Sequence, residues 1–224
     1  MNAPVPGRHM LARLTDGGEG SGIVCAPGDD EVISTVIRWR RNGWPAIVRR
    51  ENREQRRNGL VPLGIPLPPS EGKRRLSFWA EREAIASFDP PPLLRATLAS
   101  AAPGWRSWLE RVAGSFSRQG FEASVYGALL WQHLTGMEYI GKGSDLDLLC
   151  TVAQAGDFMF AVNAFQAAQE STPVLLDGEI YLPGLGWAAW RELAQNENRV
   201  ILIKHDEGEL LVDRQFAFGP VAPH

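Results

Sequence analysis

The sequence predicts an α+β protein, with α/β as the alternative, in which helices flank a central sheet. From residue 105 onward, segments with a helical period alternate with short apolar runs typical of strands, which places a sheet at the centre of a domain. The Asp-Pro-Pro-Pro run at residues 89–92 cannot continue a helix or a central strand. We therefore expect a smaller N-terminal α/β subdomain, residues 1–92, and a larger domain, residues 93–224.

The N-terminal subdomain is expected to contain one helix and two strands. Residues 29–42 have a helical pattern that stops at Gly43, as helices commonly do. Residues 45–49 and 60–66 are predicted to be extended, and two prolines in the second segment favour the edge of a sheet. The remaining segments are a glycine-rich loop, a charged connector and a basic cluster, at residues 17–22, 49–57 and 73–75.

The larger domain is expected to alternate helices and strands. Residues 105–119, for example, carry apolar side chains at the period of a helix and end at Gly120. Helices are predicted at residues 105–119, 127–134, 157–170 and 187–193, and strands at residues 123–126, 145–152, 174–182, 199–204 and 209–212.

Composition limits the classes of function. The 224 residues carry a formal net charge of −3, which argues against a general nucleic-acid-binding surface but allows a local basic pocket. No apolar run approaches the roughly 20 residues of a membrane span, and the N-terminus lacks a signal-peptide pattern, so we expect a cytoplasmic protein. Cys25 and Cys150 lack metal-ligand spacing and are expected to be inert thiols.

Asp145 and Asp147 are the first candidate site residues. They lie two apart on a predicted strand, so both side chains leave the same face. Two such carboxylates repel each other unless a cation lies between them, and Mg²⁺ prefers a few carboxylates together with phosphate oxygens. The pair therefore predicts a metal site for phosphoryl-type transfer. The alternative is an exposed edge strand whose outer face is simply acidic.

The residues on either side of this pair favour the metal site. The strand at residues 123–126 runs into Gly127-Ala128, where glycine permits close approach of a ligand and a helix N-terminus offers N–H groups to phosphate. Farther along, Asp177 and Glu179 share one face of a predicted strand, and Asp177 is preferred as a third acid because an apolar run leads directly into it. The alternative is a hairpin turn, for which Asp-Gly is a common signal.

This arrangement resembles the polymerase-β-like nucleotidyltransferases, in which the glycine turn holds a triphosphate and the acids hold metal. Ala128 stands where that superfamily usually has serine, so a hydroxyl contact to phosphate is either lost or supplied by Ser144. A closer resemblance, to the malonate decarboxylase holo-acyl-carrier-protein synthases, which are phosphoribosyl-dephospho-CoA transferases, rests on two longer motifs. These are Val-Tyr-Gly-Ala-Leu-Leu-Trp-Gln-His-Leu-Thr-Gly at residues 125–136 and Ser-Asp-Leu-Asp-Leu-Leu at residues 144–149. Shorter matches lie at residues 8–9, 45–50, 61–64, 177–179 and 189–192.

The resemblance implies a nucleotidyltransferase-like mixed sheet in a catalytic domain, residues 93–224, and substrate and carrier contacts in residues 1–92. It implies transfer of phosphoribosyl-dephospho-CoA from 2′-(5″-triphosphoribosyl)-3′-dephospho-CoA to a serine of the apo acyl-carrier subunit of malonate decarboxylase, with release of pyrophosphate. Asp145 and Asp147 would hold Mg²⁺, or Mn²⁺ as an alternative, and Asp177 would help to bind a second metal ion or would orient the serine. No nucleic-acid or membrane partner is expected.

Further residues are candidates for contacts with substrate. Gly127 and Ser144 would meet phosphate through backbone or hydroxyl. Arg49 and Arg50 are candidates for the triphosphate or the CoA phosphates, because a strand end can aim a guanidinium group, although alternation lets at most one reach a pocket. Lys204 is a weaker candidate. A solvated surface cation is the alternative for Arg50 and for Lys204.

Two other functions remain open at this stage. A nucleotidyltransferase that acts on a different small molecule, nucleic acid or protein would keep the same acids. A non-catalytic module that binds a nucleotide or CoA would keep the fold without turnover.

Overall fold

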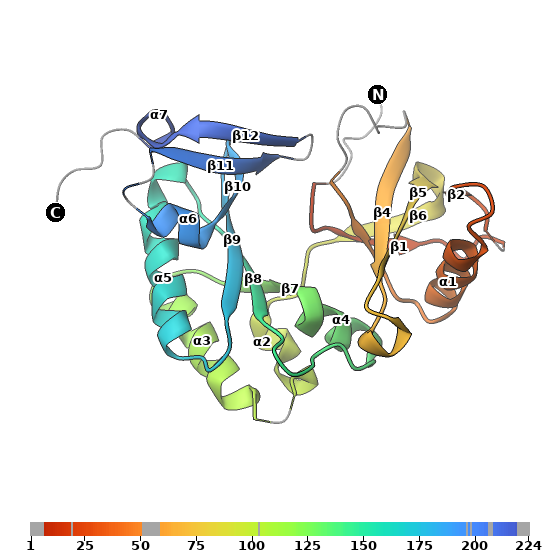
Figure 1. Cartoon of the computed structure of the whole chain (residues 1–224), viewed down its shortest axis with the longest axis horizontal. Helices are drawn as coiled ribbons and strands as arrows, with labels where there is room; N and C mark the ends of the chain where they lie inside the picture. Colours follow the sequence, from red (N-terminus) through yellow and green to blue (C-terminus); the bar gives the residue numbers. More distant parts are fainter. Residues whose placement is uncertain are drawn as a thin grey trace. The chain divides into compact units, whose positions relative to one another are not determined.

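The computed structural model describes residues 7–18, 20–50, 59–102, 104–195, 197, 199–205 and 208–218. The chain forms two compact units, of which the first runs to Pro91 and the second begins at Pro92 (Figure 1). Residue 19 of the glycine-rich loop and residues 51–57 of the charged connector lie outside the described residues. Within the described part of the chain, no helix is long and apolar enough to cross a membrane.

The first unit is a six-stranded sheet with one long helix, and its strands lie in the order β2-β5-β4-β3-β1-β6. All of its described strand pairs are antiparallel. The elements are β1 Leu11–Leu14, β2 Ile23–Val24, α1 Asp30–Arg41, β3 Ala46–Val48, β4 Leu60–Pro66, η2 Pro69–Glu71, β5 Arg75–Glu81, η3 Arg82–Ala84 and β6 Ile85–Asp89. The predicted helix and both predicted strands are present.

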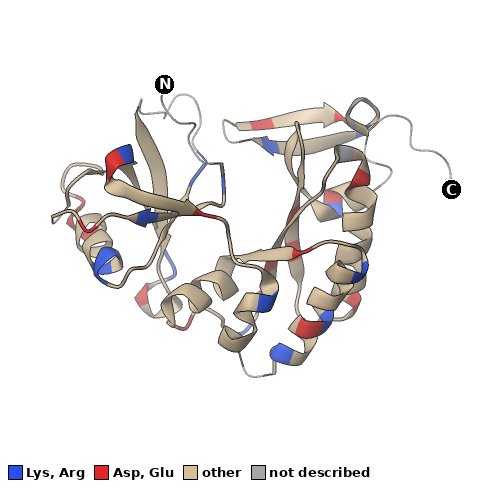
Figure 2. Cartoon of the chain, turned by 180° about the vertical axis from the view of Figure 1, so that it is seen from behind, with Lys and Arg blue, Asp and Glu red and all other residues tan. Residues whose placement is uncertain are grey.

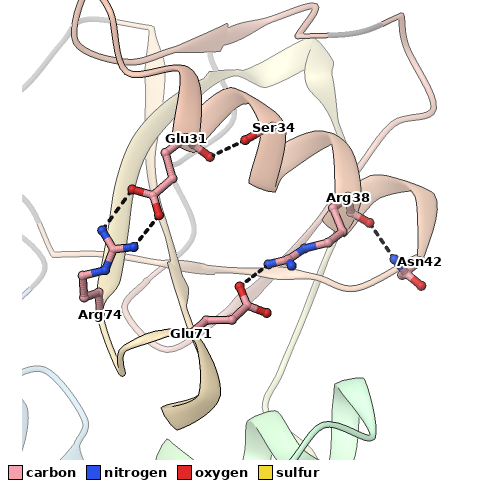
Figure 3. A network of polar contacts seen from close by, with 6 residues as sticks. All are labelled: Glu31, Ser34, Arg38, Asn42, Glu71 and Arg74. Carbon is pink, nitrogen blue, oxygen red and sulfur yellow. Dashed lines mark hydrogen bonds and ion pairs between the residues drawn. The ribbon is translucent and has the colours of Figure 1, made fainter.

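Salt bridges connect α1 to the turn between β4 and β5 (Figure 3). Arg38 Nη2 lies 2.6 Å from Glu71 Oε2 of η2, and Arg74 donates to both carboxylate oxygens of Glu31. These pairs are largely exposed, and such pairs contribute about 0–1 kcal/mol each. Arg74 belongs to the predicted basic cluster, and its charge is already paired with Glu31.

The prediction that β4 lies at the edge of its sheet is wrong. β4 lies between β3 and β5, and its prolines are tolerated for local reasons. Pro62 lies opposite the residue after β3, and its carbonyl accepts a hydrogen bond from Arg49 N. Because β3 has already ended there, the missing N–H group of Pro62 does not interrupt the hydrogen bonds between β3 and β4. Pro66 is the last residue of β4.

The second unit is a six-stranded mixed sheet in the order β12-β11-β10-β9-β8-β7. β8 and β9 are parallel, whereas the other pairs with a described register are antiparallel. The strands are β7 Ala123–Tyr126, β8 Leu146–Thr151, β9 Leu176–Leu182, β10 Gly186–Ala189, β11 Val200–His205 and β12 Gly208–Asp213. The helices are α2 Leu94–Thr97, η4 Leu98–Ser100, α3 Arg106–Arg118, α4 Gly127–Thr135, η5 Ala155–Asp157, α5 Phe158–Glu170, α6 Trp190–Ala194 and α7 Arg214–Phe218. The α+β prediction with a central mixed sheet is confirmed.

Helices α3 and α5 lie along one face of this sheet (Figure 1). Phe165 of α5 stacks on Trp190 with ring centroids 5.5 Å apart, and it meets Phe116 of α3 edge to face at 4.9 Å. A Cβ added to Gly178 of β9 would lie 2.3 Å from Phe165 Cε1. Gly178 therefore faces the helices from within a strand, and the alternative of an Asp-Gly hairpin turn is wrong.

The predicted helix at residues 187–193 is half wrong. Residues up to Ala189 form β10, which pairs with β9 across a tight turn, and only Trp190–Ala194 is helical. The Trp-Ala-Ala-Trp run fits a helical period as well as a strand, so the choice is made by pairing with β9 rather than by local preference.

Candidate active site

Two acids of the predicted site meet across the parallel pair of strands. Asp147 of β8 and Asp177 of β9 are direct partners in the β8–β9 register, so their side chains leave the same face of two strands whose backbones lie about 5 Å apart. Gly178, the neighbour of Asp177, faces the helices, and alternation therefore places both acids on the opposite face of the sheet. We call this the open face, because Asp177 is exposed there. Acidic segments on the middle strands are visible in Figure 2. Like charges at this spacing are unfavourable without a cation.

Gly127 lies directly against Asp147. Tyr126, the last residue of β7, is the register partner of Asp147, and Gly127 follows as the first residue of α4. Its φ of +66° is a conformation that other residues rarely adopt. A Cβ there would lie 1.8 Å from Asp147 Oδ2 and 2.6 Å from Cγ. Glycine is therefore required twice, for the turn and for the close approach of the carboxylate to the start of α4.

Asp145 and Ser144 lie on the loop that leads into β8. β8 begins at Leu146, so Asp145 directly precedes the strand instead of belonging to it as predicted. Ser144 closes a turn: Gly141 N donates to Ser144 Oγ at 2.9 Å, and Ser144 N donates to Gly141 O at 3.1 Å. The hydroxyl of Ser144 thus has a structural bond, and it retains a proton that it can donate.

Gln132 of α4, which the sequence analysis did not single out as a site residue, fixes the same loop. Its Oε1 accepts hydrogen bonds from the backbone N–H groups of Tyr139 and Ile140, at 3.2 and 3.1 Å. Its Nε2 donates to Ser100 O at 2.7 Å. The helix that starts at the acid pair therefore also holds the loop that carries Asp145. Partners seven and eight residues away leave no signal in a sequence pattern.

Glu179 and Lys204 form an ion pair on the same face, in which Glu179 is buried and Lys204 is half-buried. Glu179 is 4% exposed, and its Oε1 lies 2.7 Å from Lys204 Nζ of β11. Because the two charges neutralise each other, Glu179 is a poorer candidate for a metal ligand than the exposed Asp177. The preference for Asp177 as the third acid is consistent with this difference.

The remaining candidates lie elsewhere or have local contacts. Ala128 is half-buried in the first turn of α4. Arg49 and Arg50 belong to the first unit, where Arg49 donates from Nε to Leu63 O at 2.9 Å and lies over the Trp79 ring. Arg50 is exposed. His133 of α4 bonds through Nδ1 to Ser100 Oγ at 2.8 Å.

The acids fit an open metal site better than a closed one. Among the described residues, no group of three or more His, Cys, Asp and Glu side chains is arranged to hold a metal ion. The acid pair with its close glycine supplies two carboxylates at adjacent positions of the sheet. Mg²⁺ commonly takes one or two carboxylates and completes its shell with substrate phosphates and water. The donor set fits an ion bound in that way.

The cysteines have no part in this site. Cys25 and Cys150 are both free thiols, and burial raises the pKa of the Cys150 thiol to about 12. Such a thiol is not a nucleophile near neutral pH, because the thiolate is the reactive form. The structure agrees with the expectation of an inert thiol at Cys150.

Comparison with known proteins covers almost the entire chain. The family models described as the N-terminal and C-terminal domains of phosphoribosyl-dephospho-CoA transferase MdcG match residues 7–91 and 93–215. A protein of Bradyrhizobium diazoefficiens named phosphoribosyl-dephospho-CoA transferase is 36% identical over 96% of this chain and 93% of its own length. One of the same name from Xanthomonas campestris pv. campestris is 32% identical over 95% of this chain and 96% of its own length. No solved structure matches. The chain belongs to the phosphoribosyl-dephospho-CoA transferase family.

Proposed function

We propose that the protein transfers phosphoribosyl-dephospho-CoA from 2′-(5″-triphosphoribosyl)-3′-dephospho-CoA to a serine of an apo acyl-carrier subunit of malonate decarboxylase. The observation that carries the proposal is the pair Asp147 and Asp177, in register on parallel strands, with Gly127 against Asp147. Membership of the family supports the class of donor. The carrier subunit, the metal and the leaving group are parts of the proposal.

The transfer is a substitution at phosphorus. The serine Oγ forms a bond to the α-phosphorus of the donor, the bond from that phosphorus to the bridging oxygen breaks, and pyrophosphate leaves. The serine loses its proton, and we propose that a carboxylate on the open face accepts it. Asp177 is the more exposed of the two register partners, so we assign to it the orientation of the incoming hydroxyl.

The start of α4 is the proposed phosphate site. The first N–H groups of a helix have no partner within the helix, and its dipole favours an anion there. α4 has nine residues and begins at Gly127, next to Asp147. The backbone of Gly127 and Ala128 would bind the triphosphate, and the Ser144 hydroxyl would donate to it. Arg49 and Arg50 remain proposed cationic contacts, and Lys204 is the weakest of the three candidates because it is already paired with Glu179.

Mg²⁺, or Mn²⁺ in its place, would neutralise charge on the triphosphate and lower the pKa of the attacking hydroxyl. Asp147 and Asp177 are the ligands that the register brings together, and Asp145 is the third proposed ligand. An ion held by these carboxylates would in turn bind the reacting phosphate at the open face, where the carrier serine has access. We further propose that the reaction takes place in the cytoplasm and involves no nucleic acid.

Mass spectrometry of the apo carrier subunit tests the proposal. Incubation with the triphosphoribosyl donor, Mg²⁺ and the enzyme should add the mass of phosphoribosyl-dephospho-CoA to one serine and release pyrophosphate. Transfer of a plain nucleotide from a nucleoside triphosphate, with no reaction of the proposed donor, would favour a nucleotidyltransferase with another acceptor. Binding of the donor without any transfer would point to a non-catalytic module.

A further inference from the structure

A row of three side chains crosses the open face of the same sheet. Tyr181 of β9 is the register partner of Trp187 of β10, which is in turn the partner of Lys204 of β11. The Tyr181 and Trp187 rings lie with centroids 5.2 Å apart and planes inclined by 55°. All three side chains are half-buried, so each aromatic ring keeps some accessible surface.

This row shares its face with the acid pair. Along β9 the residues Asp177, Glu179 and Tyr181 alternate with Gly178, which packs on Phe165 of α5. Tyr181 is four residues from Asp177, about 13 Å along an extended strand. An elongated ligand that begins at the acid pair and follows β9 would therefore reach the aromatic rings.

The charge of the row is already balanced. Lys204 Nζ is held at 2.7 Å by Glu179, which is itself buried. A phosphate group would have to compete with the Glu179 carboxylate for the Lys204 ammonium group. An uncharged flat ring could bind beside the pair without breaking that interaction. The exposed part of the row is thus better suited to a heteroaromatic base than to an anion.

We infer that Tyr181 and Trp187 form the binding site for the adenine base of the dephospho-CoA donor. The inference rests on the proposed function, in which the α-phosphorus lies at Asp147 and Asp177. In that donor two ribose units separate the reacting phosphorus from the base, a separation that the distance along β9 accommodates. Because Glu179 already neutralises the charge of Lys204, the site suits a nucleoside that carries no 3′-phosphate.

Titration calorimetry with dephospho-CoA, which lacks the triphosphate, tests the base site separately from transfer. Trp187→Leu should weaken the binding of dephospho-CoA roughly tenfold, since stacking of a base on an aromatic ring raises affinity by at least about that factor. Trp187→Phe, which keeps an aromatic ring, should retain most of the native affinity. 4′-Phosphopantetheine, which lacks the base, should bind the native protein and Trp187→Leu equally.

Trp105 provides the matched control. It forms a tilted pair with Trp108 of α3, with centroids 4.8 Å apart, away from the sheet strands. Trp105→Leu should leave the affinity for dephospho-CoA unchanged. Equal affinity of Trp187→Leu and the native protein, or no binding of dephospho-CoA to a native protein that transfers the full donor, would overturn the base site. Binding that depends on Trp187 without any transfer to a carrier would retain the base site and overturn the proposed function.

Discussion

The two faces of the sheet in the second unit are made from the same strands but carry opposite kinds of side chain. On the helix side, Gly178 packs on Phe165, and Leu148 and Ile180 are fully buried. On the open side, β9 presents Asp177 and Glu179. Alternation along one strand thus serves packing and chemistry at neighbouring residues. A substitution on the helix side should therefore lower stability, whereas one at the acid pair on the open side should lower transfer.

Gly127→Ala should produce the largest effect on transfer. The added Cβ would overlap Asp147 Oδ2, so the carboxylate or the start of α4 must move. We expect a loss on the order of 10²-fold or more in kcat/KM, since displacement of a reacting group by about 1 Å costs that much. Steady-state transfer to the carrier measures it.

Gly136→Ala is the control for this change. Gly136 follows the other end of α4 with a φ of +70°, and nothing lies within 4 Å of an added Cβ. The left-handed conformation alone should cost about 1–2 kcal/mol of unfolding free energy and leave kcat/KM near native. Equal losses of transfer in the two variants would show that backbone conformation, and not contact with Asp147, makes Gly127 necessary.

Asp177→Asn and Glu179→Gln should separate chemistry from stability on the open face itself. Asp177→Asn is expected to lower kcat/KM strongly with little change in unfolding free energy, because the side chain is exposed. Glu179→Gln removes the negative charge that neutralises Lys204 and should cost about 1–3 kcal/mol of unfolding free energy. Urea denaturation and transfer rates measure both. The reverse pattern would exchange the roles of the two acids.

Gly178→Ala should act on the helix side. Its Cβ would lie 2.3 Å from Phe165 Cε1 and 2.9 Å from Leu148 O, so overpacking should cost about 1–3 kcal/mol of unfolding free energy. The rate per folded molecule should remain near native. Adding Phe165→Leu should recover part of the lost stability. A large loss of kcat/KM in fully folded Gly178→Ala protein would contradict the separation of the two faces.

The smallest effect should come from Cys150 and appear only at high pH. Burial raises its pKa from 9.0 to about 12, so the thiol ionises in the unfolded chain before it does so in the folded one. Its contribution to stability is complete below pH 9 and is lost as the pH rises toward 12. Cys150→Ala should therefore flatten the fall of unfolding free energy above pH 9. An identical slope in both proteins would argue against the shift.

Local patterns were sufficient for elements whose partners are close in sequence. The helices predicted at residues 105–119 and 127–134 match α3 and α4 to within a residue or two. β5 was not predicted, although Leu76, Phe78 and Ala80 alternate with exposed or half-buried residues and are all buried. β10 could not be distinguished from a helix, because pairing with β9 decides its state.

The candidate site was predictable only in part, for a similar reason. The spacing of Asp145 and Asp147 suggested one face of a strand, yet the close pair in the structure is Asp147 and Asp177, which are thirty residues apart. The bond between Glu179 and Lys204 likewise depends on strands that meet only in the folded sheet. Residue types indicated the chemistry, and the register shows which of the acids are neighbours.

The most direct measurement is transfer of the donor group to the apo carrier subunit by four proteins of matched folded fraction: native, Asp145→Asn, Asp147→Asn and Asp177→Asn. We expect losses on the order of 10³-fold in kcat/KM for Asp147→Asn and Asp177→Asn, with a smaller loss for Asp145→Asn, because only the first two are register partners. Undiminished transfer by folded Asp147→Asn would contradict an active face built on this pair.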